Sequence, residues 1–454
     1  MVGLARLFLE SGAQVTGSDQ SVYPPMSDVL NDLGIKIVEG YHPKNLSELP
    51  ELAIIGNVIR PENPEAREVI RLGMPYTSMA GALENYFLNG KKRLVVSGTH
   101  GKTTLTSMIA WILYDQGLDP GFFVGGIPTN FGFSSRLGRG NYFVIEGDEY
   151  DTAFFDKTPK FLHYRADLAI VSSIEFDHAD IYQSIDQIKS QFLAFLSAMP
   201  AQGIVIACSD YETVRNVAEF SGRQTQHYGL KDGAEWTVRI LEQRPNGLTV
   251  GIYLHDHFVC QGELPFVGIH NALNCLAAIT TVSNLGLEPE TAIKSMEKFR
   301  GVQRRQQIYE HESGVTIIDD FAHHPTAVKV TCEAVRSANP GKRVVAVFEP
   351  RTNTSRRSIF QRTYVDSFLS ADLVVLREPP VGASDNSADL FSSRQLAKDI
   401  NSRGGRAQAF DNGDQVLDYL LETVRAGDIV LIMSNGNFEG VRSRLLNQLG
   451  GGIL

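Results

Sequence analysis

A strand, a glycine-rich loop and a helix follow one another in residues 93–113, which read RLVVSGTHGKTTLTSMIAWIL. The usual phosphate-binding pattern, G-x-x-x-x-G-K-[ST], has a first glycine five residues before the glycine that precedes the lysine. This chain has Val96 at that place, and the nearest earlier glycine is Gly98. The stretch is therefore either a chance Gly-Lys-Thr or a variant phosphate loop. Its place between a strand and an amphipathic helix favours the variant loop, which requires a βα unit.

This loop predicts a nucleotide site. Glycines allow backbone N–H groups to turn inward, and the helix N-terminus adds positive partial charge. In this interpretation Lys102 reaches the β- and γ-phosphates, and the hydroxyl of Thr103 ligates Mg²⁺. The loop residues expected at the nucleotide are Gly98, Thr99, His100, Gly101, Lys102, Thr103 and Thr104.

Short apolar strands alternate with helical patterns along almost the whole chain, which predicts βαβ units and mostly parallel sheets. The strand RLVVSG opens a second block near residue 90, and GVTIIDDF opens a third after residue 301. A chain of 454 residues has room for about two to four domains of ordinary size. We therefore expect an α/β protein with three domains, residues 1–89, 90–301 and 302–454.

Composition narrows the class of protein. The formal net charge is −10 and no Lys/Arg run suggests a basic face, so we do not expect nucleic acid as the main partner. No apolar run approaches the ~20 residues needed to cross a bilayer, and the first residues lack a signal-peptide pattern. The four cysteines have no C-x-x-C spacing, which suits reduced thiols better than disulfides or a zinc site. These features predict a cytoplasmic enzyme that binds neither nucleic acid nor a membrane.

Two further strands end in residues that suit a metal–phosphate site. VIEGDEYD ends in four carboxylates, of which Glu146, next to the strand end, is the best candidate for Mg²⁺. IVSSIEFDH places Asp177 and His178 just past another strand end. A solvated acidic loop and a structural Asp-His pair are the alternatives for each stretch taken alone. Because the carboxyl ends of parallel strands face one cleft, Lys102, Glu146 and His178 together indicate a shared site.

Polar residues at two later junctions could complete the nucleotide site. His270, Asn271 and Asn274 begin a helix. Asn271 alone is explained as a helix cap, whereas Asn274, one turn later, could bond an adenine edge. In GVQRRQQ, Arg304 and Arg305 are either surface residues or a clamp on phosphates from the next domain.

The stretch IIDDFAHHP places Asp319, Asp320, His323 and His324 at another strand end. Two adjacent histidines could bind a transition metal, but no third ligand stands at a recognisable spacing. A contact with a nucleotide ribose or phosphate suits these residues better.

Taken together, the motifs resemble the Mur ligase family, ATP-dependent amide-bond ligases of bacterial cell-wall synthesis. The family's phosphate loop is G-T-x-G-K-[ST], which GTHGKTT matches. E-x-D-E-x-D, DH, HN-x-x-N, an arginine after G-V, and DD-[FY]-x-HHP follow in the family's order. The resemblance covers essentially the whole chain. It implies a Rossmann-like N-terminal domain, a central phosphate-loop ATPase domain and a Rossmann-like C-terminal domain, with ATP and Mg²⁺ as cofactors.

Within the family, the stretches EGDEYDTAFFDK, SIEFDHADIY, FEPRTNT and IVLIMSNGNFEG look most like members that join UDP-N-acetylmuramate to the recycled tripeptide L-alanyl-γ-D-glutamyl-meso-diaminopimelate. Both substrates are small molecules, and the resemblance implies an acyl-phosphate intermediate. The alternative is the sister activity that adds free L-alanine, whose third domain carries different stretches in place of EPRTNT and MSNGNFEG. A nucleotide-dependent binding protein and a motor or switch ATPase are rivals from other classes. The chain could be a monomer or a dimer.

The resemblance also implies roles by position. Lys102 would hold the β- and γ-phosphates, Thr103 and Glu146 the first Mg²⁺, and His178 a second Mg²⁺. The other expected nucleotide contacts are Asn271 and Asn274 to adenine, Arg305 to the phosphates and Asp320 to the ribose. The expected catalytic residues are Lys102, His178, His323 and Arg305.

Substrate contacts are expected at further strand ends. Asp19 and Asn57 are expected at the UDP substrate. Arg351, Asn353, Ser434 and Asn435 are expected at the incoming peptide, and a plain surface loop is the alternative for each. Lys189 lies in roughly the region where some relatives carry a carbamylated lysine.

One departure concerns the first residues. The family pattern begins with a strand and a glycine-rich loop ahead of the helix that here reads GLARLFLESG, and this chain starts inside that unit at Met1-Val2-Gly3. The resemblance therefore implies that the first strand of the Rossmann-like domain is missing, and we expect that the start codon is assigned too late. If the short chain is the real one, we expect weak binding of the UDP substrate and an unstable first domain.

Overall fold

The computed structural model describes residues 1–22, 26–179, 181–231, 233–380 and 390–449. The chain divides into two compact units. The first unit consists of Met1–Glu175, Ser184–Thr237 and Leu276–Ser295. The second unit consists of Phe176–Gln183, Val238–Cys275 and Met296–Leu454.

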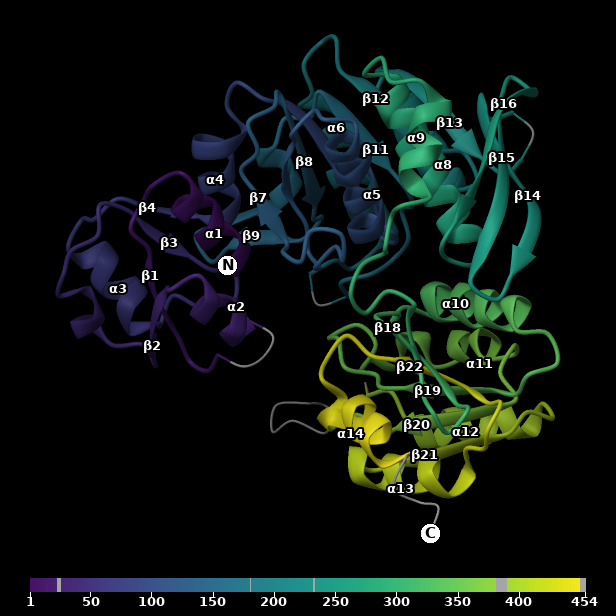
Figure 1. Cartoon of the computed structure of the whole chain (residues 1–454). Coiled ribbons are helices and arrows are strands. Elements are labelled where there is room, and N and C mark those ends of the chain that lie inside the picture. The colour runs from purple at the N-terminus through teal and green to yellow at the C-terminus, as the bar shows by residue number, and fades with distance from the viewer. Residues whose placement is uncertain (23–25, 180, 232, 381–389, 450–454) are drawn as a thin grey trace. The chain divides into compact units, whose positions relative to one another are not determined.

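The four strands described within residues 1–22 and 26–89 form two separate parallel sheets of two strands each, labelled in Figure 1. The strands are β1 (Thr16–Asp19) with β2 (Lys36–Glu39), and β3 (Ala53–Ile55) with β4 (Tyr76–Ser78). The helices are α1 (Val2–Glu10), α2 (Met26–Asp32), α3 (Pro64–Arg71) and α4 (Met79–Leu83). Helix α3 begins and ends as the sequence indicates, because Asn63 caps its first N–H groups and Gly73 follows its last turn at φ 63°.

A ten-stranded sheet carries the phosphate loop, and its strand order is β16-β15-β14-β13-β12-β11-β5-β8-β6-β7. Strands β11, β5 and β8 are parallel neighbours, so their carboxyl ends lie at one edge of the sheet. The strands are β5 (Lys92–Ser97), β6 (Gly121–Phe123), β7 (Ser135–Arg136), β8 (Tyr142–Gly147), β11 (Leu168–Val171), β12 (Ile204–Cys208), β13 (Gln224–Gly229), β14 (Trp236–Arg244), β15 (Gly247–Leu254) and β16 (His257–Leu264). A hairpin of β9 (Asp151–Ala153) and β10 (Asp156–Pro159) follows β8.

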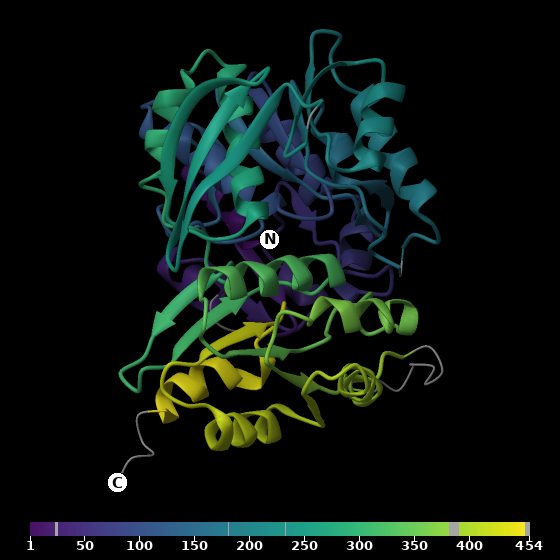
Figure 2. The same cartoon turned by 90° about the vertical axis from the view of Figure 1, so that its right-hand side faces the viewer.

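Burial explains the two kinds of strand in this sheet. The middle of β5, Leu94–Val96, is fully buried, as expected for a parallel strand that is covered on both faces. In β16 buried and exposed residues alternate towards its end, as expected for an antiparallel strand with one open face. The long strands β14, β15 and β16 are the teal arrows of Figure 2. The helices of this part are α5 (Lys102–Asp115), α6 (Ile185–Ser197), α7 (Glu212–Phe220), α8 (Ile269–Ser283) and α9 (Pro289–Met296).

The second unit contains a six-stranded sheet in the order β17-β18-β22-β19-β20-β21. Only β17, at the edge, is antiparallel to its neighbour among the pairings described. The strands are β17 (Gln307–Glu310), β18 (Thr316–Asp320), β19 (Val344–Phe348), β20 (Leu373–Arg377), β21 (Ala407–Phe410) and β22 (Ile429–Met433). The helices are α10 (Pro325–Ala338), α11 (Thr363–Ser367), α12 (Ser393–Ser402), α13 (Gly413–Thr423) and α14 (Val441–Gln448).

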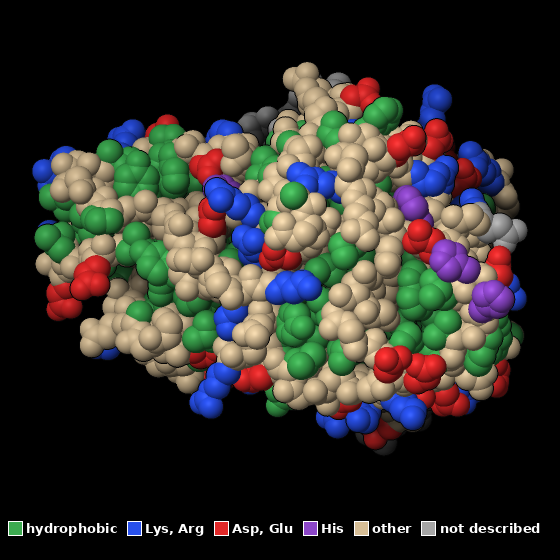
Figure 3. Space-filling model, turned by 90° about the horizontal axis from the view of Figure 1, so that it is seen from above, with side chains coloured by type: hydrophobic (Ala, Val, Ile, Leu, Met, Phe, Trp, Pro, Cys, Tyr) green, Lys and Arg blue, Asp and Glu red, His purple; other side chains and the backbone are tan. Residues whose placement is uncertain are grey.

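Side chains of this sheet alternate between two cores, and Figure 1 shows helices on both faces. Ala346 and Phe348 of β19 join the core formed with α10, α11 and α12, whereas Val345 and Val347 join the core formed with α13 and α14. This arrangement confirms the α/β class. On the molecular face drawn in Figure 3, basic and acidic side chains are interspersed.

Candidate active site

The phosphate loop connects β5 to α5 in the first unit, and its two glycines cannot be replaced without strain. Gly98 has φ 134°, and a Cβ there would lie 2.2 Å from Ser172 Oγ and 2.9 Å from the backbone nitrogen of Ser173. Gly101 is the N-cap of α5 and has φ 79°. Because glycine has no side chain, it makes no capping hydrogen bond to the first N–H groups of the helix. The N–H groups at the start of α5 therefore remain suited to an anion.

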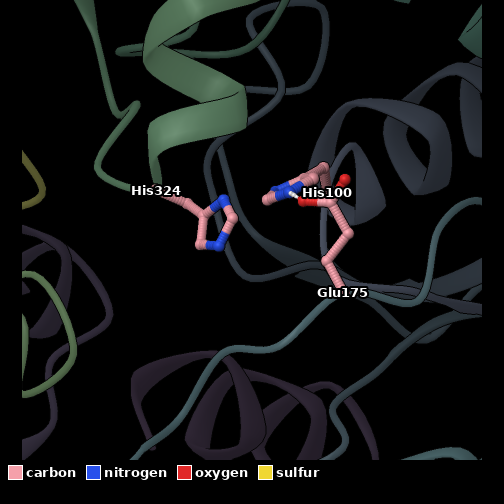
Figure 4. A group of neighbouring side chains, drawn as sticks. All are labelled: His100, Glu175 and His324. Atoms are coloured by element: carbon pink, nitrogen blue, oxygen red, sulfur yellow. Dashed lines mark hydrogen bonds and ion pairs between the residues drawn. The ribbon is translucent and has the colours of Figure 1, made fainter. Parts of the chain in front are cut away.

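Hydrogen bonds tie the loop to the residues after β11. The N–H of Thr99 donates to the carbonyl oxygen of Ser173 at 2.9 Å, and the N–H of His100 donates to Ser173 Oγ at 3.0 Å. His100 Nε2 lies 2.9 Å from a carboxylate oxygen of Glu175, as the dashed line in Figure 4 marks. The loop is thus held in place by the neighbouring strand end, which reduces the ordering that a nucleotide must impose.

Two side-chain pairs follow the loop. Lys102 Nζ donates to Glu149 Oε2 at 2.7 Å and to the carbonyl oxygen of Gly98 at 2.8 Å. Thr103 Oγ1 donates to Glu146 Oε1 at 2.9 Å. The sequence predicted Thr103 and Glu146 at one metal ion, and the structure brings their oxygens together. Glu149 is only 3% exposed, so its pair with Lys102 is buried.

The charges of these residues shift one another's pKa. Burial alone would lower the pKa of Lys102, but Glu149, Asp148 and Glu146 outweigh burial and raise the pKa above its ordinary value. Burial, together with the charge of Asp148, raises the pKa of Glu146. Lys102 therefore stays an ammonium group, whereas Glu146 lies in surroundings that favour a cation beside it.

A second buried lysine, Lys160, lies in the same group of side chains. Its Nζ is 3.0 Å from Asp148 Oδ2 and 4.1 Å from the centre of the Tyr150 ring. We use the name phosphate-loop cluster for the six residues Lys102, Thr103, Glu146, Asp148, Glu149 and Lys160.

A second group of polar residues lies in the second unit, and we use the name histidine cluster for Asp177, His178, His323 and His324. Burial alone would raise the pKa of Asp177, but the three imidazoles outweigh it and hold the pKa well below its usual range. His178 has φ 53°, a conformation that few residues other than glycine adopt. Its N–H donates to Asp177 Oδ1 at 2.7 Å.

The two neighbouring histidines of this cluster have different hydrogen bonds. His324 caps α10: its Nδ1 accepts from the N–H of Thr326 at 3.3 Å, and its Nε2 donates to the carbonyl oxygen of Phe176 at 3.2 Å. His323 Nδ1 lies 3.1 Å from the carbonyl oxygen of Phe321, to which it donates. His324 therefore uses both ring nitrogens to hold backbone, whereas the neutral form of His323 keeps its lone pair on Nε2.

Asp320, Gln306 and Asn271 connect three segments of the second unit. The N–H of Gln306 donates to Asp320 Oδ2 at 2.9 Å, and Asn271 Nδ2 donates to Gln306 Oε1 at 3.2 Å. Asn274 follows one turn after Asn271 and is 8% exposed. Burial raises the pKa of Asp320, although Arg305 partly offsets this effect. Four residues that the sequence assigned to one nucleotide, Asn271, Asn274, Arg305 and Asp320, thus lie in this unit.

The residues expected at the peptide lie near the ends of β19 and β22. Arg304 Nη2 donates to the carbonyl oxygens of Ser434 and Gly436 at 2.7 and 2.6 Å. Arg351 packs against Gly436, where an added Cβ would lie 2.0 Å from its Nη1. Both arginines therefore contact this loop.

The other peptide candidates differ in exposure. Ser434 is buried and donates its hydroxyl to Glu349 at 2.6 Å. Asn435 Oδ1 is buried with no hydrogen-bond partner among the described residues. Asn353 is exposed. Arg351 and Asn353 are thus better placed than Ser434 and the buried amide oxygen of Asn435 to contact a ligand by their side chains.

Three remaining predicted residues belong to the first unit. Asn57 Nδ2 donates to the carbonyl oxygen of Asp151, which joins residues 1–89 to the hairpin after β8. Asp19 ends β1 and accepts from the N–H of Ser21 at 3.3 Å. Lys189 lies in α6, 3.1 Å from Asp186.

Comparison with known families decides the class of protein. Three models match in succession, described as Mur ligase family, catalytic domain (residues 1–89), Mur ligase middle domain (96–282) and Mur ligase, glutamate ligase domain (304–436). The chain belongs to the Mur ligase family. The α/β class and the motif order expected from the sequence agree with this result.

Similar Mur ligases cover the chain end to end. Relatives from Escherichia coli and Haemophilus influenzae, both named UDP-N-acetylmuramate–L-alanyl-gamma-D-glutamyl-meso-2,6-diaminoheptandioate ligase, are 37% and 35% identical over 99% of this chain and 96% of their own length. A UDP-N-acetylmuramate–L-alanine ligase from Desulforamulus reducens is 33% identical over 99% of this chain and 95% of its own. A solved murein peptide ligase from Psychrobacter arcticus matches with a TM-score of 0.72 at 32% identity, covering 100% of this chain and 97% of the other.

Mur ligases are ATP-dependent, so the chain is an ATP-dependent ligase that forms an amide bond. This result confirms the predicted enzyme class over a binding protein and over a motor ATPase. In the part of the chain that the structure describes, no helix is both long and apolar enough to span a membrane.

The phosphate-loop cluster fits both the phosphates of ATP and the Mg²⁺ ion that a Mur ligase would bind. The start of α5 offers N–H groups and Lys102 to phosphates. Thr103 and Glu146 offer two oxygens, 2.9 Å apart, of the hard type that Mg²⁺ prefers.

Sequence motifs did not reveal every member of this cluster. No motif paired Glu149 with Lys102 or singled out Lys160. The available signal was weak, because Lys160 is a lone lysine between Pro159 and the apolar pair Phe161-Leu162.

Proposed function

We propose that this Mur ligase joins the carboxylate of UDP-N-acetylmuramate to the amine of L-alanyl-γ-D-glutamyl-meso-diaminopimelate in peptidoglycan recycling. The observation that carries the proposal is the pairing of Lys102 with Glu149 and of Thr103 with Glu146 at the N-terminus of α5. This arrangement supports transfer of a phosphoryl group to a carboxylate. The names of the relatives from Escherichia coli and Haemophilus influenzae support the choice of amine.

The proposed reaction has two steps. A carboxylate oxygen of the muramate attacks the γ-phosphorus of ATP, the bond to the bridging oxygen breaks, and ADP leaves with that electron pair. The amine nitrogen of the tripeptide then attacks the carbonyl carbon of the acyl phosphate, and the tetrahedral adduct expels phosphate. The nitrogen loses one proton as the amide forms, so a proton acceptor is needed near it.

In the first step the phosphate-loop cluster supplies the charge. Lys102 would bind the β- and γ-phosphates, while Thr103 and Glu146 would hold Mg²⁺. The ion, when bound, offsets the negative charge that develops on the transferred phosphoryl group. His178 is proposed for a second Mg²⁺. Asn271 and Asn274 are proposed at adenine, with Asp320 at the ribose and Arg305 at the phosphates.

In the second step we propose that His323 accepts the proton that the amine nitrogen loses. Its Nδ1 donates to a backbone carbonyl, so the neutral ring presents a lone pair on Nε2. His324 is committed at both nitrogens to the start of α10 and to Phe176. The adjacent histidines thus have separate tasks, proton transfer and support.

The substrates are proposed to divide among the three sequence regions. Residues 1–89 would hold the UDP part, with contacts from Asp19 and Asn57. Residues 90–301 would hold ATP, and residues 302–454 the tripeptide. The tripeptide carries several carboxylates, and the exposed guanidinium of Arg351 and the side-chain N–H groups of Asn353 and Asn435 are donors that suit carboxylates.

Isotope transfer tests the intermediate. UDP-N-acetylmuramate labelled with ¹⁸O in its carboxylate is incubated with the enzyme, ATP, Mg²⁺ and tripeptide. An acyl phosphate passes one labelled oxygen to each phosphate released, which mass spectrometry of phosphate detects. Amide product with unlabelled phosphate would overturn the acyl phosphate, and absence of any amide product would overturn the proposed activity.

Addition of free L-alanine is the second candidate. It is favoured by the 33% identity of the Desulforamulus reducens relative, whose printed name gives that activity. The two candidates share the activation step and differ only in the amine.

A further inference from the structure

Lys160 is a buried lysine that no step of the proposed reaction uses. It is 5% exposed and begins the short 3-10 helix Lys160–His163 after β10. Lysine is rarely buried unless its charge is paired. Here the ammonium group contacts Asp148 at 3.0 Å and the face of Tyr150, whose centroid is 4.1 Å away. The side chain is therefore held by the turn that follows β8.

Backbone bonds hold the same turn. The N–H of Lys160 donates to the carbonyl oxygen of Tyr150, and the N–H of Phe161 donates to that of Asp148, each at 3.2 Å. The side chains of Tyr150 and Asp148 are also hydrogen-bonded to one another. Lys160 and its neighbour thus fix the two residues that flank Glu149.

Glu149 is the partner of the phosphate-loop lysine, Lys102, at 2.7 Å. The turn therefore holds one of two partners of Lys102, which also donates to the carbonyl oxygen of Gly98 at 2.8 Å. Lys102 also lies in the field of Asp148. An Asp148 released from Lys160 would compete for the same ammonium group and draw it away from phosphates.

The net charge of the phosphate-loop cluster also indicates a role for Lys160. The carboxylates of Glu146, Asp148 and Glu149 face the ammonium groups of Lys102 and Lys160, which leaves one net negative charge in the cluster. Without Lys160 there would be two, and a negatively charged nucleotide would be repelled more strongly.

We propose that Lys160 is a positioning residue of the nucleotide site: it binds Asp148, so that Glu149 alone pairs with Lys102 and the nucleotide meets one net negative charge instead of two. Lys160 acts through Asp148 and does not touch the substrates. The inference depends on ATP use by the chain and on the proposed role of the phosphate-loop cluster.

A double-mutant cycle on the full-length enzyme tests this inference. The dissociation constant of ADP with Mg²⁺ is measured by titration calorimetry for the wild type, Lys160→Met, Asp148→Asn and the double variant. Lys157→Met is the matched control, because Lys157 lies in the same hairpin with its side chain 69% exposed. Thermal melting of each variant reports folding.

We expect Lys160→Met to weaken ADP binding about tenfold, the size of effect that one charge at this range produces. The double variant restores one net negative charge and should bind within about twofold of the wild type. Asp148→Asn alone should bind no more weakly than the wild type, and Lys157→Met should be unchanged. In the ligase assay the Lys160→Met defect should fall on KM for ATP more than on kcat, and Lys160→Arg should recover part of it.

Two results would overturn the inference. A double variant as weak as Lys160→Met would mean that Lys160 contacts the ligand itself. A Lys160→Met variant with wild-type affinity would mean that Lys160 only supports the fold. If Lys160→Met does not fold, because it leaves a buried carboxylate unpaired, Lys160→Gln, which can still donate to Asp148 but carries no charge, replaces it under the same criteria. ADP titration needs no product, so failure of the ligase reaction would leave this test intact.

Discussion

Three carboxylates surround two lysines in the phosphate-loop cluster, whereas one carboxylate lies among three imidazoles in the histidine cluster. The first cluster is built from the start of α5, the end of β8, the turn after β8 and Lys160, and its carboxylates hold the pKa of Lys102 above its ordinary value. The second cluster is built from two segments about 145 residues apart, and its imidazoles hold the pKa of Asp177 well below its usual range. The difference agrees with the proposed division of work, in which the first cluster binds the nucleotide and His323 accepts a proton from the amine.

The largest effect is expected from Lys102→Gln in the phosphate-loop cluster. Glutamine keeps hydrogen-bonding capacity but removes the charge that would bind the phosphates. We expect kcat/KM for ATP to fall about 10²–10³-fold, as for other lost transition-state contacts. Activity within tenfold of the wild type, with the thermal melt unchanged, would show that the charge of Lys102 is not needed for the use of ATP.

The next effect separates the two histidines. His323→Ala should lower kcat about 10²-fold, because a positioned proton acceptor is lost, with little change in stability. His324→Ala should lower the free energy of unfolding by about 0.5–2 kcal/mol, because α10 loses its cap, while kcat changes less. Urea unfolding and steady-state kinetics on both variants check this. The reverse pattern would exchange the two assignments.

Asp177→Asn probes the charge of the histidine cluster. The pKa of Asp177 is depressed in the folded protein, so its carboxylate stabilises the fold above the ordinary pKa of about 3.9. This contribution is lost as pH falls through the lower, folded pKa.

At pH 7 the variant should therefore be less stable by about 1–3 kcal/mol. The difference from the wild type should shrink progressively below about pH 4. Urea unfolding at pH 7, 5 and 3 measures it. A difference that stays constant or grows on acidification would contradict the assigned charge.

The smallest effect is expected from Lys189→Ala, which lies outside both clusters. Its partner in the structure is Asp186 on the same helix, at 3.1 Å, and such helical pairs contribute only about 0.3–0.5 kcal/mol. We expect activity within about twofold of the wild type, and stability within ±0.5 kcal/mol, about the usual range for surface substitutions. A tenfold loss of activity that bicarbonate partly restores would instead show that Lys189 is carbamylated and works at the metal.

The sequence predicted the phosphate-loop cluster better than the histidine cluster. Strand, loop and helix are local patterns, so the positions of Lys102 and Thr103 followed from the chain itself. Glu146 followed from the rule that parallel strands end at one edge, and β5 and β8 are indeed parallel neighbours. The α/β class is confirmed, while the three domain boundaries and the residue roles stay predictions.

Two features could not be predicted from local patterns. The contact of Lys160 with Asp148 exists because a hairpin folds residues 12 positions apart back on one another. His323 and His324 are identical neighbours in the sequence, and only the start of α10 distinguishes them by taking one as its cap. Both features depend on how the backbone folds. The residue type of a side chain does not by itself determine its partner.

Competition between two amines tests the central claim most directly. The enzyme is given UDP-N-acetylmuramate, ATP and Mg²⁺ with equal concentrations of L-alanyl-γ-D-glutamyl-meso-diaminopimelate and L-alanine, and the two amide products are quantified by mass spectrometry. The account predicts that the tripeptide product dominates. A dominant L-alanine product would contradict it and assign the chain to the second candidate activity.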